Sequence, residues 1–165
     1  MLVLGIDPGL ATTGFGIIKE DDQGEISEVD HGVVRTDAAW PIAERLANLY
    51  TEITKLLLLH QPHEAAVEKL FFARNVTSGI AVGEARGVLL LALAQNQVPI
   101  YEYTPLEVKQ AVTGYGNADK RQMQEMVKVH LALPSIPKPD DAADALAVAL
   151  CHAHSYRIKR LDRMP

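Results

Sequence analysis

Residues 1–18, which read MLVLGIDPGLATTGFGII, constrain the fold more than any other stretch of this chain. Residues 2–6 form a nearly continuous apolar run, typical of a strand buried on both faces of a sheet, and the run ends at the acid Asp7. Pro8-Gly9 then favours a turn, and residues 14–18 resume a strand-like pattern. The stretch therefore predicts a hairpin with a carboxylate at its open end. The alternative is that Asp7 only begins the turn, because Asp and Pro-Gly are ordinary turn residues.

The rest of the chain predicts alternating helices and strands after this hairpin. Apolar spacing predicts the element order βββ-α-β-α-β-α-α-α, with no internal repeat or linker, and Thr36 or Asp37 is a candidate cap for the first helix. We expect strands within residues 2–7, 14–18, 26–35, 64–68 and 99–103, and helices at about 41–60, 77–96, 105–112, 119–131 and 140–160. The 165 residues, 48% of them hydrophobic, suit one domain spanning 1–165.

Composition constrains where the protein is expected in the cell and which partners it can bind. No segment approaches the roughly 18 apolar residues of a membrane span, and Met1 leads straight into the first strand, so we expect a cytoplasmic protein. The single cysteine, Cys151, excludes an internal disulfide and is expected in the core. The net charge of −5 argues against a polyanionic partner, unless several acids gather at one metal site.

Acidic residues follow two strands that should be neighbours in the sheet. The strand at residues 64–68 arrives after a helix, so it should lie parallel to the first strand and beside it. Glu68 ends this strand as Asp7 ends the first one. Because open α/β sheets place their sites at the carboxyl ends of parallel strands, we expect the two carboxylates to converge there.

The last helix begins with three further acids, in the run DDAADALA at residues 140–147. Asp141 and Asp144 are three residues apart and share one helix face, with small alanines that let this face approach the sheet, whereas Asp140 points elsewhere. Acids in a first helical turn also act as caps or complement the helix dipole. That explanation does not cover Asp144, which lies within an apolar face where an acid is costly unless it is paired or bound to a cation.

Four carboxylates without a Cys or His ligand set predict a hard cation. Oxygen ligands favour Mg²⁺, with Mn²⁺ as the alternative, over zinc. Two such ions about 4 Å apart activate water and stabilise the leaving oxygen in phosphodiester hydrolysis. The expected chemistry is therefore metal-dependent cleavage of nucleic acid.

Five separated motifs, in order along nearly the whole chain, resemble the RuvC family of Holliday-junction resolvases. They are GIDPG at 5–9 with Gly14 and Gly16, EKLFF at 68–72, GEARG at 83–87, EVKQAV at 107–112 and DAADALA at 141–147. The resemblance implies an α/β, ribonuclease-H-like fold, with a mixed five-stranded sheet (three antiparallel strands, then two parallel strands) flanked by helices. It also implies that Asp7, Glu68, Asp141 and Asp144 are the catalytic, metal-binding residues.

The same resemblance assigns DNA contacts. Phe71 matches the family's aromatic residue at the junction centre, and Lys109 and Lys120 match its basic positions. Lys69 and Arg74, beside the Phe71-Phe72 pair, suit a stacking and phosphate-binding patch, with Phe72 expected in the core. The loop TGYGNA at 113–118 departs from the family pattern at Tyr115 and Asn117, which leaves contacts there less certain.

The implied function is resolution of four-way DNA junctions by paired, symmetric cleavage in homologous recombination and DNA repair, with a RuvA and RuvB type branch-migration complex as partner. Two incisions related by a two-fold axis predict a homodimer. The helix at 77–96 is the candidate interface, because residues 88–93 are apolar nearly all round. A helix wholly buried within the monomer is the alternative.

Two rival functions remain at this stage. An actin-like kinase or ATPase also begins with a Gly-rich hairpin and an Asp, but that class clamps its nucleotide between two such domains and this chain has room for one. A catalytically silent junction-binding protein of the same fold is the other rival. The presence of all four acids weighs against it.

Overall fold

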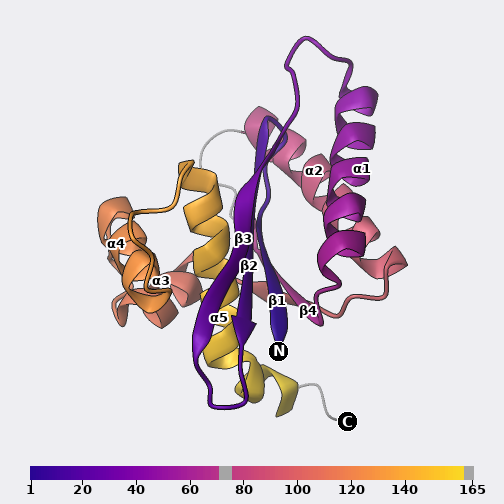
Figure 1. Ribbon diagram of the computed structural model, residues 1–165. Helices are drawn as coiled ribbons and strands as arrows, with labels where there is room; N and C mark the ends of the chain where they lie inside the picture. The colour runs from indigo at the N-terminus through magenta and orange to yellow at the C-terminus, as the bar shows by residue number, and fades with distance from the viewer. Residues whose placement is uncertain (71–75, 162–165) are drawn as a thin grey trace.

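A central sheet with strand order β3-β2-β1-β4-β5 organises the chain, and the computed structural model describes residues 1–70 and 76–161 (Figure 1). The first three strands are antiparallel, whereas β4 is parallel to β1 and β5 is parallel to β4. The predicted mixed topology is therefore confirmed. The strands are β1 (Leu2–Asp7), β2 (Thr12–Glu20), β3 (Ile26–Arg35), β4 (Glu64–Glu68) and β5 (Ile100–Tyr103).

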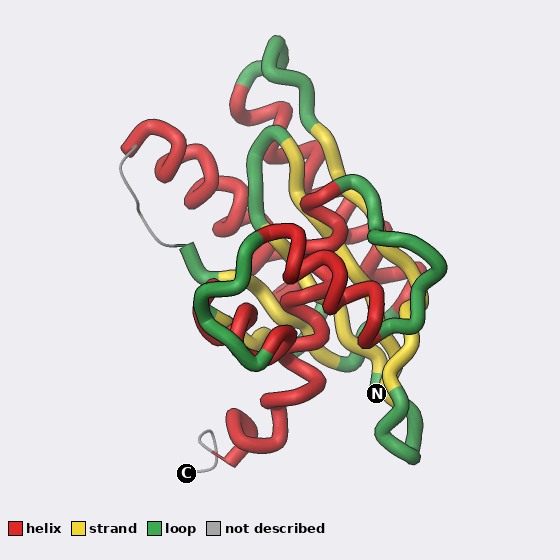
Figure 2. Tube along the Cα trace, turned by 90° about the vertical axis from the view of Figure 1, so that its left-hand side faces the viewer, coloured by secondary structure: helices red, strands yellow, loops and turns green. Residues whose placement is uncertain are grey.

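Helices lie on both sides of this sheet (Figure 2). The alternation of side chains along each strand divides the core between the two faces. In β1, Val3 packs with the helices of one face and Leu4 with those of the other; in β4, Ala66 and Val67 alternate in the same way. On one face lie α3 (Pro105–Thr113), α4 (Lys120–His130) and α5 (Asp140–Leu161), and on the other lie α1 (Ile42–His60) and α2 (Val76–Gln95).

Three glycines bring α5 against the first two strands. A Cβ atom at Gly14 would lie 1.9 Å from the carbonyl oxygen of Asp141, and one at Gly5 would lie 2.1 Å from the carbonyl oxygen of Ala145. A Cβ atom at Gly16 would lie 2.7 Å from the backbone nitrogen of Leu146. Any side chain at these positions would push the helix away. The glycines thus place the acidic start of α5 over the end of β1.

The predicted cap of α1 is wrong. Pro41 occupies the N-cap position and no side chain caps the helix. Thr36 instead donates from Oγ1 to the carbonyl oxygen of Leu10 (2.6 Å) and accepts from Nε of Arg45 (2.9 Å), and Asp37 accepts a hydrogen bond within its own turn. Thr36 therefore joins the β1–β2 turn to α1, which is a tertiary contact that local sequence does not reveal.

The other local predictions hold with small changes in boundaries. Pro105 opens α3 after the N-cap Thr104, and Asp119 caps α4, each with a complete capping box. Cys151 is fully buried, as expected. Of the helices that the structure describes, none is both long and apolar enough to cross a lipid bilayer.

Candidate active site

The ends of β1 and β4 carry the first two acids of the site. Ile6 and Val67 are partners in the parallel register, so the next residues, Asp7 and Glu68, leave the sheet side by side. Both side chains are half-buried. The prediction that these two strand ends meet is therefore confirmed.

A pocket of about 220 Å³ opens beside these acids, and Asp144 of α5 is the third carboxylate in its wall. Lys109 of α3 and Lys120 of α4 also line it. The apolar part of the wall comes from the three helices that meet here, through Pro105, Val108, Met123 and Ala147. The structure thus brings three of the four predicted acids and two predicted lysines to one pocket.

The fourth acid, Asp141, lies nearby but does not line this pocket. Its backbone carbonyl group packs over Gly14, and its charge is close enough to raise the pKa of Asp7. Asp140 has a different environment, because its carboxylate binds Nζ of Lys120 and Nζ of Lys138, both at 3.3 Å. These bonds, with that from Lys120 the strongest, lower the pKa of Asp140.

Burial and mutual repulsion perturb the acids of the pocket. Burial, followed by the charges of Glu68, Asp144 and Asp141, raises the pKa of Asp7 to about 8. Burial, followed by the charge of Asp144, raises the pKa of Glu68 to about 7. Burial also raises the pKa of Asp144, against the opposing effect of Lys120, whose Nζ lies 3.6 Å from its Oδ2. The pocket therefore strongly favours an added positive charge.

The donor set fits a hard divalent cation. Carboxylate oxygens are the ligands that Mg²⁺ and Mn²⁺ prefer, and Lys120 supplies only one positive charge among several acids. Among the described residues, no three carboxylate, imidazole or thiol groups converge closely enough to hold one ion by themselves. Mg²⁺ in phosphate-processing sites is commonly held by one or two carboxylates together with waters and substrate phosphates. Asp7, Glu68 and Asp144 line one pocket and could contribute to such a shared coordination shell.

The remaining predicted DNA contacts differ in their placement. Lys69 is exposed next to Glu68, and its backbone nitrogen donates to the carbonyl oxygen of Tyr103 (2.8 Å). Phe71 and Arg74 lie outside the described residues.

Sequence reasoning missed the apolar wall of the pocket and the ion pair between Lys120 and Asp144. Met123 follows Lys120 by three residues, and Ala147 follows Asp144 by three, so each shares a helix face with a charged residue of the pocket. This spacing was a usable signal for the wall. The ion pair depends on how α4 docks against α5, and no local pattern reports that.

Comparisons with known proteins agree with this geometry. The family model for crossover junction endodeoxyribonuclease RuvC matches residues 3–152. The chain is similar to the crossover junction endodeoxyribonuclease RuvC of Desulfitobacterium hafniense (strain DSM 10664 / DCB-2), with 57% identity over 164 residues, covering 99% of this chain and 98% of that protein. It also resembles the solved structure of Thermus thermophilus RuvC in complex with Holliday junction substrate, with 36% identity, a TM-score of 0.91 and 96% of each chain covered.

A more distant structure shares the fold alone. The yeast mitochondrial Holliday junction resolvase Ydc2 is 15% identical, with a TM-score of 0.67 over 96% of this chain and 82% of that chain. The match to RuvC structures confirms the predicted ribonuclease-H-like α/β fold. With a family model spanning most of its length and a relative at 57% identity, this chain belongs to the RuvC family of crossover junction endodeoxyribonucleases.

Proposed function

We propose that this protein is a Mg²⁺-dependent endonuclease that resolves four-way (Holliday) DNA junctions by paired, symmetric phosphodiester cleavage. The observation that carries the proposal is the pocket at the sheet edge, where Asp7, Glu68 and Asp144 meet with raised pKa values beside Lys109 and Lys120. Family membership supports the substrate, because the similar Thermus thermophilus structure holds a Holliday junction. A nucleotide-clamping kinase does not fit this family.

Each residue of the pocket has a distinct role in this proposal. Asp7, Glu68 and Asp144, together with the neighbouring Asp141, hold two Mg²⁺ ions, for which Mn²⁺ can substitute. Bound metal supplies an activated water and stabilises the developing negative charge on the phosphate. Lys109 and Lys120 lie on adjacent helices at the same pocket and attract the DNA backbone to it. The apolar wall lowers the polarity on one side of the pocket, which strengthens electrostatic interactions there.

The protein acts as a homodimer in this proposal, because two symmetric incisions need two pockets. The burial of side chains on α2 narrows the candidate residues for the dimer interface. Leu89 and Leu93 are fully buried in the monomer, where α2 packs on both α1 and the sheet, whereas Ile80 (59% exposed) and Leu91 (51% exposed) face outward. Part of the apolar character of α2 is therefore explained by the monomer core. Its outward face remains the candidate for the dimer contact.

The cellular setting follows from the substrate. Four-way junctions arise in homologous recombination and DNA repair, and in this proposal the protein acts on them in the cytoplasm. A branch-migration complex of the RuvA and RuvB type is the proposed partner. Neither assignment rests on the geometry of the pocket.

Cleavage of labelled synthetic junctions tests the proposal. The protein is incubated with a four-way junction or plain duplex, with EDTA, Mg²⁺ or Mn²⁺, and nicks are mapped on every strand. We expect symmetric nicks in the junction only, and only with metal. Single amide replacements should abolish nicking while leaving junction binding in EDTA intact: Asp7→Asn, Glu68→Gln, Asp141→Asn and Asp144→Asn.

Asp22→Asn, in the exposed β2–β3 turn, is the matched control and should cut normally. Cleavage by Asp144→Asn at the wild-type rate would mean that Asp144 is not part of the catalytic site. Junction binding without nicks under every metal condition would instead identify a silent binding protein.

A further inference from the structure

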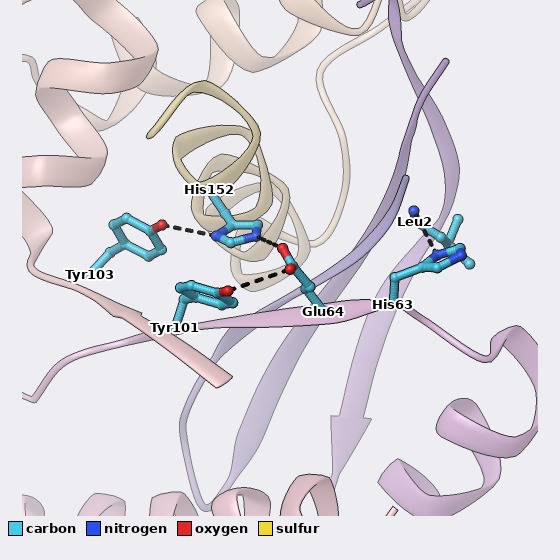
Figure 3. A network of polar contacts seen from close by, with 6 residues as sticks. All are labelled: Leu2, His63, Glu64, Tyr101, Tyr103 and His152. Carbon is cyan, nitrogen blue, oxygen red and sulfur yellow. Dashed lines mark hydrogen bonds and ion pairs between the residues drawn. The ribbon is translucent and has the colours of Figure 1, made fainter. Parts of the chain in front are cut away.

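A buried polar network joins α5 to the parallel strands β4 and β5 (Figure 3). Its hydrogen-bonded side chains do not line the carboxylate pocket, although Tyr103 is the register partner of Glu68. Nε2 of His152 lies 2.8 Å from Oε2 of Glu64, and Nδ1 of His152 lies 2.9 Å from the hydroxyl of Tyr103. The hydroxyl of Tyr101 donates to Oε1 of Glu64 at 3.4 Å. His152 and Tyr103 are fully buried, and Glu64 is 6% exposed.

The hydrogen bonds of His152 to Glu64 and Tyr103 are compatible with one neutral tautomer. With its proton on Nε2, His152 donates to the Glu64 carboxylate and accepts at Nδ1 from the Tyr103 hydroxyl. Burial raises the pKa of that hydroxyl. Breaking a hydrogen bond between two buried polar groups is costly, because each group was removed from water to form it.

The network includes two of the three elements that carry the acids of the pocket, β4 and α5. On β4, Glu64 precedes Glu68 by four residues, a rise of about 13 Å along a strand. On α5, His152 follows Asp144 by eight residues, a rise of about 12 Å along a helix. The chain runs toward the pocket in β4 and away from it in α5, so the two separations match. Glu64 and His152, and likewise Glu68 and Asp144, thus mark two places at which β4 and α5 face each other.

We propose that the Glu64–His152 hydrogen bond is a positioning contact that fixes the register of α5 against β4, and thereby the separation of Asp144 from Glu68 in the metal site. This inference rests on the proposed function of those two acids.

The Glu64–His152 bond adds a directional contact to an interface that is otherwise held by close packing. Gly5, Gly14 and Gly16 face backbone atoms of α5 and the side chains of Ala149 and Leu146. This packing sets how closely α5 approaches β1 and β2, whereas the Glu64–His152 bond reaches β4. A slide by one helical residue, about 1.5 Å, would break a directional bond of 2.8 Å. The buried bond therefore ties the register of α5 to β4.

Two variants of Glu64 separate positioning from general stability. Glu64→Leu removes the bond to His152 at nearly constant volume, whereas Glu64→Gln keeps an acceptor for it. Two further variants are controls. Tyr103→Phe deletes the other bond of His152 but leaves its bond to Glu64. Leu57→Ala weakens the core on the opposite face of the sheet.

Four measurements are made on the full chain: thermal stability, Mn²⁺ binding by calorimetry without DNA, junction binding in EDTA, and the Mg²⁺ concentration that gives half-maximal cleavage. We expect Glu64→Leu to weaken Mn²⁺ binding and raise the Mg²⁺ midpoint by roughly 10-fold, as is common when the support of a metal ligand is lost. Saturating Mg²⁺ should restore most of the rate, and junction binding should not change. Glu64→Gln and Tyr103→Phe should stay within roughly 3-fold of wild type in Mn²⁺ affinity.

Two outcomes would overturn the inference. One is wild-type Mn²⁺ binding by folded Glu64→Leu; the other is an equal loss of Mn²⁺ binding in Leu57→Ala at the same loss of thermal stability. If Glu64→Leu does not fold, Glu64→Asp replaces it, because it retracts the carboxylate by one methylene and keeps the charge. Asp144→Asn separates the two proposals: unchanged Mn²⁺ binding in that variant would reject the metal site itself.

Discussion

Replacing Asp7 by Asn should make the metal-free protein more stable at pH 8 while removing its activity. Burial and three neighbouring acids raise the pKa of Asp7 from 3.8 to about 8. The folded state therefore holds a proton that the unfolded chain releases, and its stability is fully present below about pH 4 and lost as the pH rises toward 8. Asn resembles the protonated acid in shape and carries no charge, so the variant escapes this loss.

The size of the effect follows from the same pKa change. About 1.4 kcal/mol accompanies each pKa unit, which sets an upper limit of about 6 kcal/mol for a pKa that moves from 3.8 to about 8. Asp7 titrates together with Glu68 and Asp144, so the repulsion is shared within a coupled group and we expect about 3 kcal/mol. For a chain of 165 residues this corresponds to a rise in Tm of roughly 6 to 12 °C.

Thermal unfolding at pH 4 and pH 8, with EDTA or with Mg²⁺, is the assay. In EDTA, Asp7→Asn should unfold at a higher temperature than wild type at pH 8 and at nearly the same temperature at pH 4. Mg²⁺ should raise the Tm of wild type and narrow the difference, because the cation favours the ionised acids. Asp22→Asn should follow wild type throughout. A variant less stable than wild type at pH 8 in EDTA would refute the idea that repulsion strains this site.

Three further predictions concern DNA binding and assembly. Lys109→Ala and Lys120→Ala should weaken junction binding for every sequence and flatten the slope of log affinity against log salt by roughly one per lost phosphate contact; an unchanged slope in a salt titration would place these lysines away from DNA. Phe71→Ala should lower cleavage of a labelled junction and keep the fold, since stacking contributes roughly 1 to 3 kcal/mol per base; a loss of stability of roughly 3 to 5 kcal/mol on chemical denaturation would show that Phe71 belongs to the core. In sedimentation, Leu91→Asp should convert a dimer to the 18.0 kDa monomer without unfolding it, whereas Leu93→Asp, in the monomer core, should unfold the protein; a stable Leu91→Asp dimer would place the interface elsewhere.

The acids of the pocket were predictable because each occupies a position that local rules define. Asp7 and Glu68 end apolar strands, and a strand that arrives after a helix is expected to lie parallel to the first strand, which the pairing of β4 with β1 confirms. Asp144 was recognisable as an acid within an apolar helix face. The roles of these acids in catalysis remain predictions.

The packing of α2 could not be predicted from the local sequence pattern. The run at residues 88–93 is apolar nearly all round, and its sequence does not tell which side chains contact α1, the sheet or a second copy. The structure buries Leu89 and Leu93 and leaves Leu91 outside. The spacing of apolar residues indicates how much of a helix surface is apolar. Which elements cover that surface depends on how the rest of the chain packs.

By itself, the sequence determined the strand and helix pattern, the mixed sheet and the carboxylates at its edge, because hydrophobic periodicity, caps and turn residues act over a few residues. Only the tertiary structure decided that Lys120 pairs with Asp144, that Thr36 joins Arg45 instead of capping a helix, and that Glu64 meets His152 across 88 positions of the chain. Such contacts depend on the docking of whole elements, and a single polar residue carries no local mark of its distant partner. Docking of α5 on the glycines of β1 and β2 is therefore what turns separate acids into one pocket.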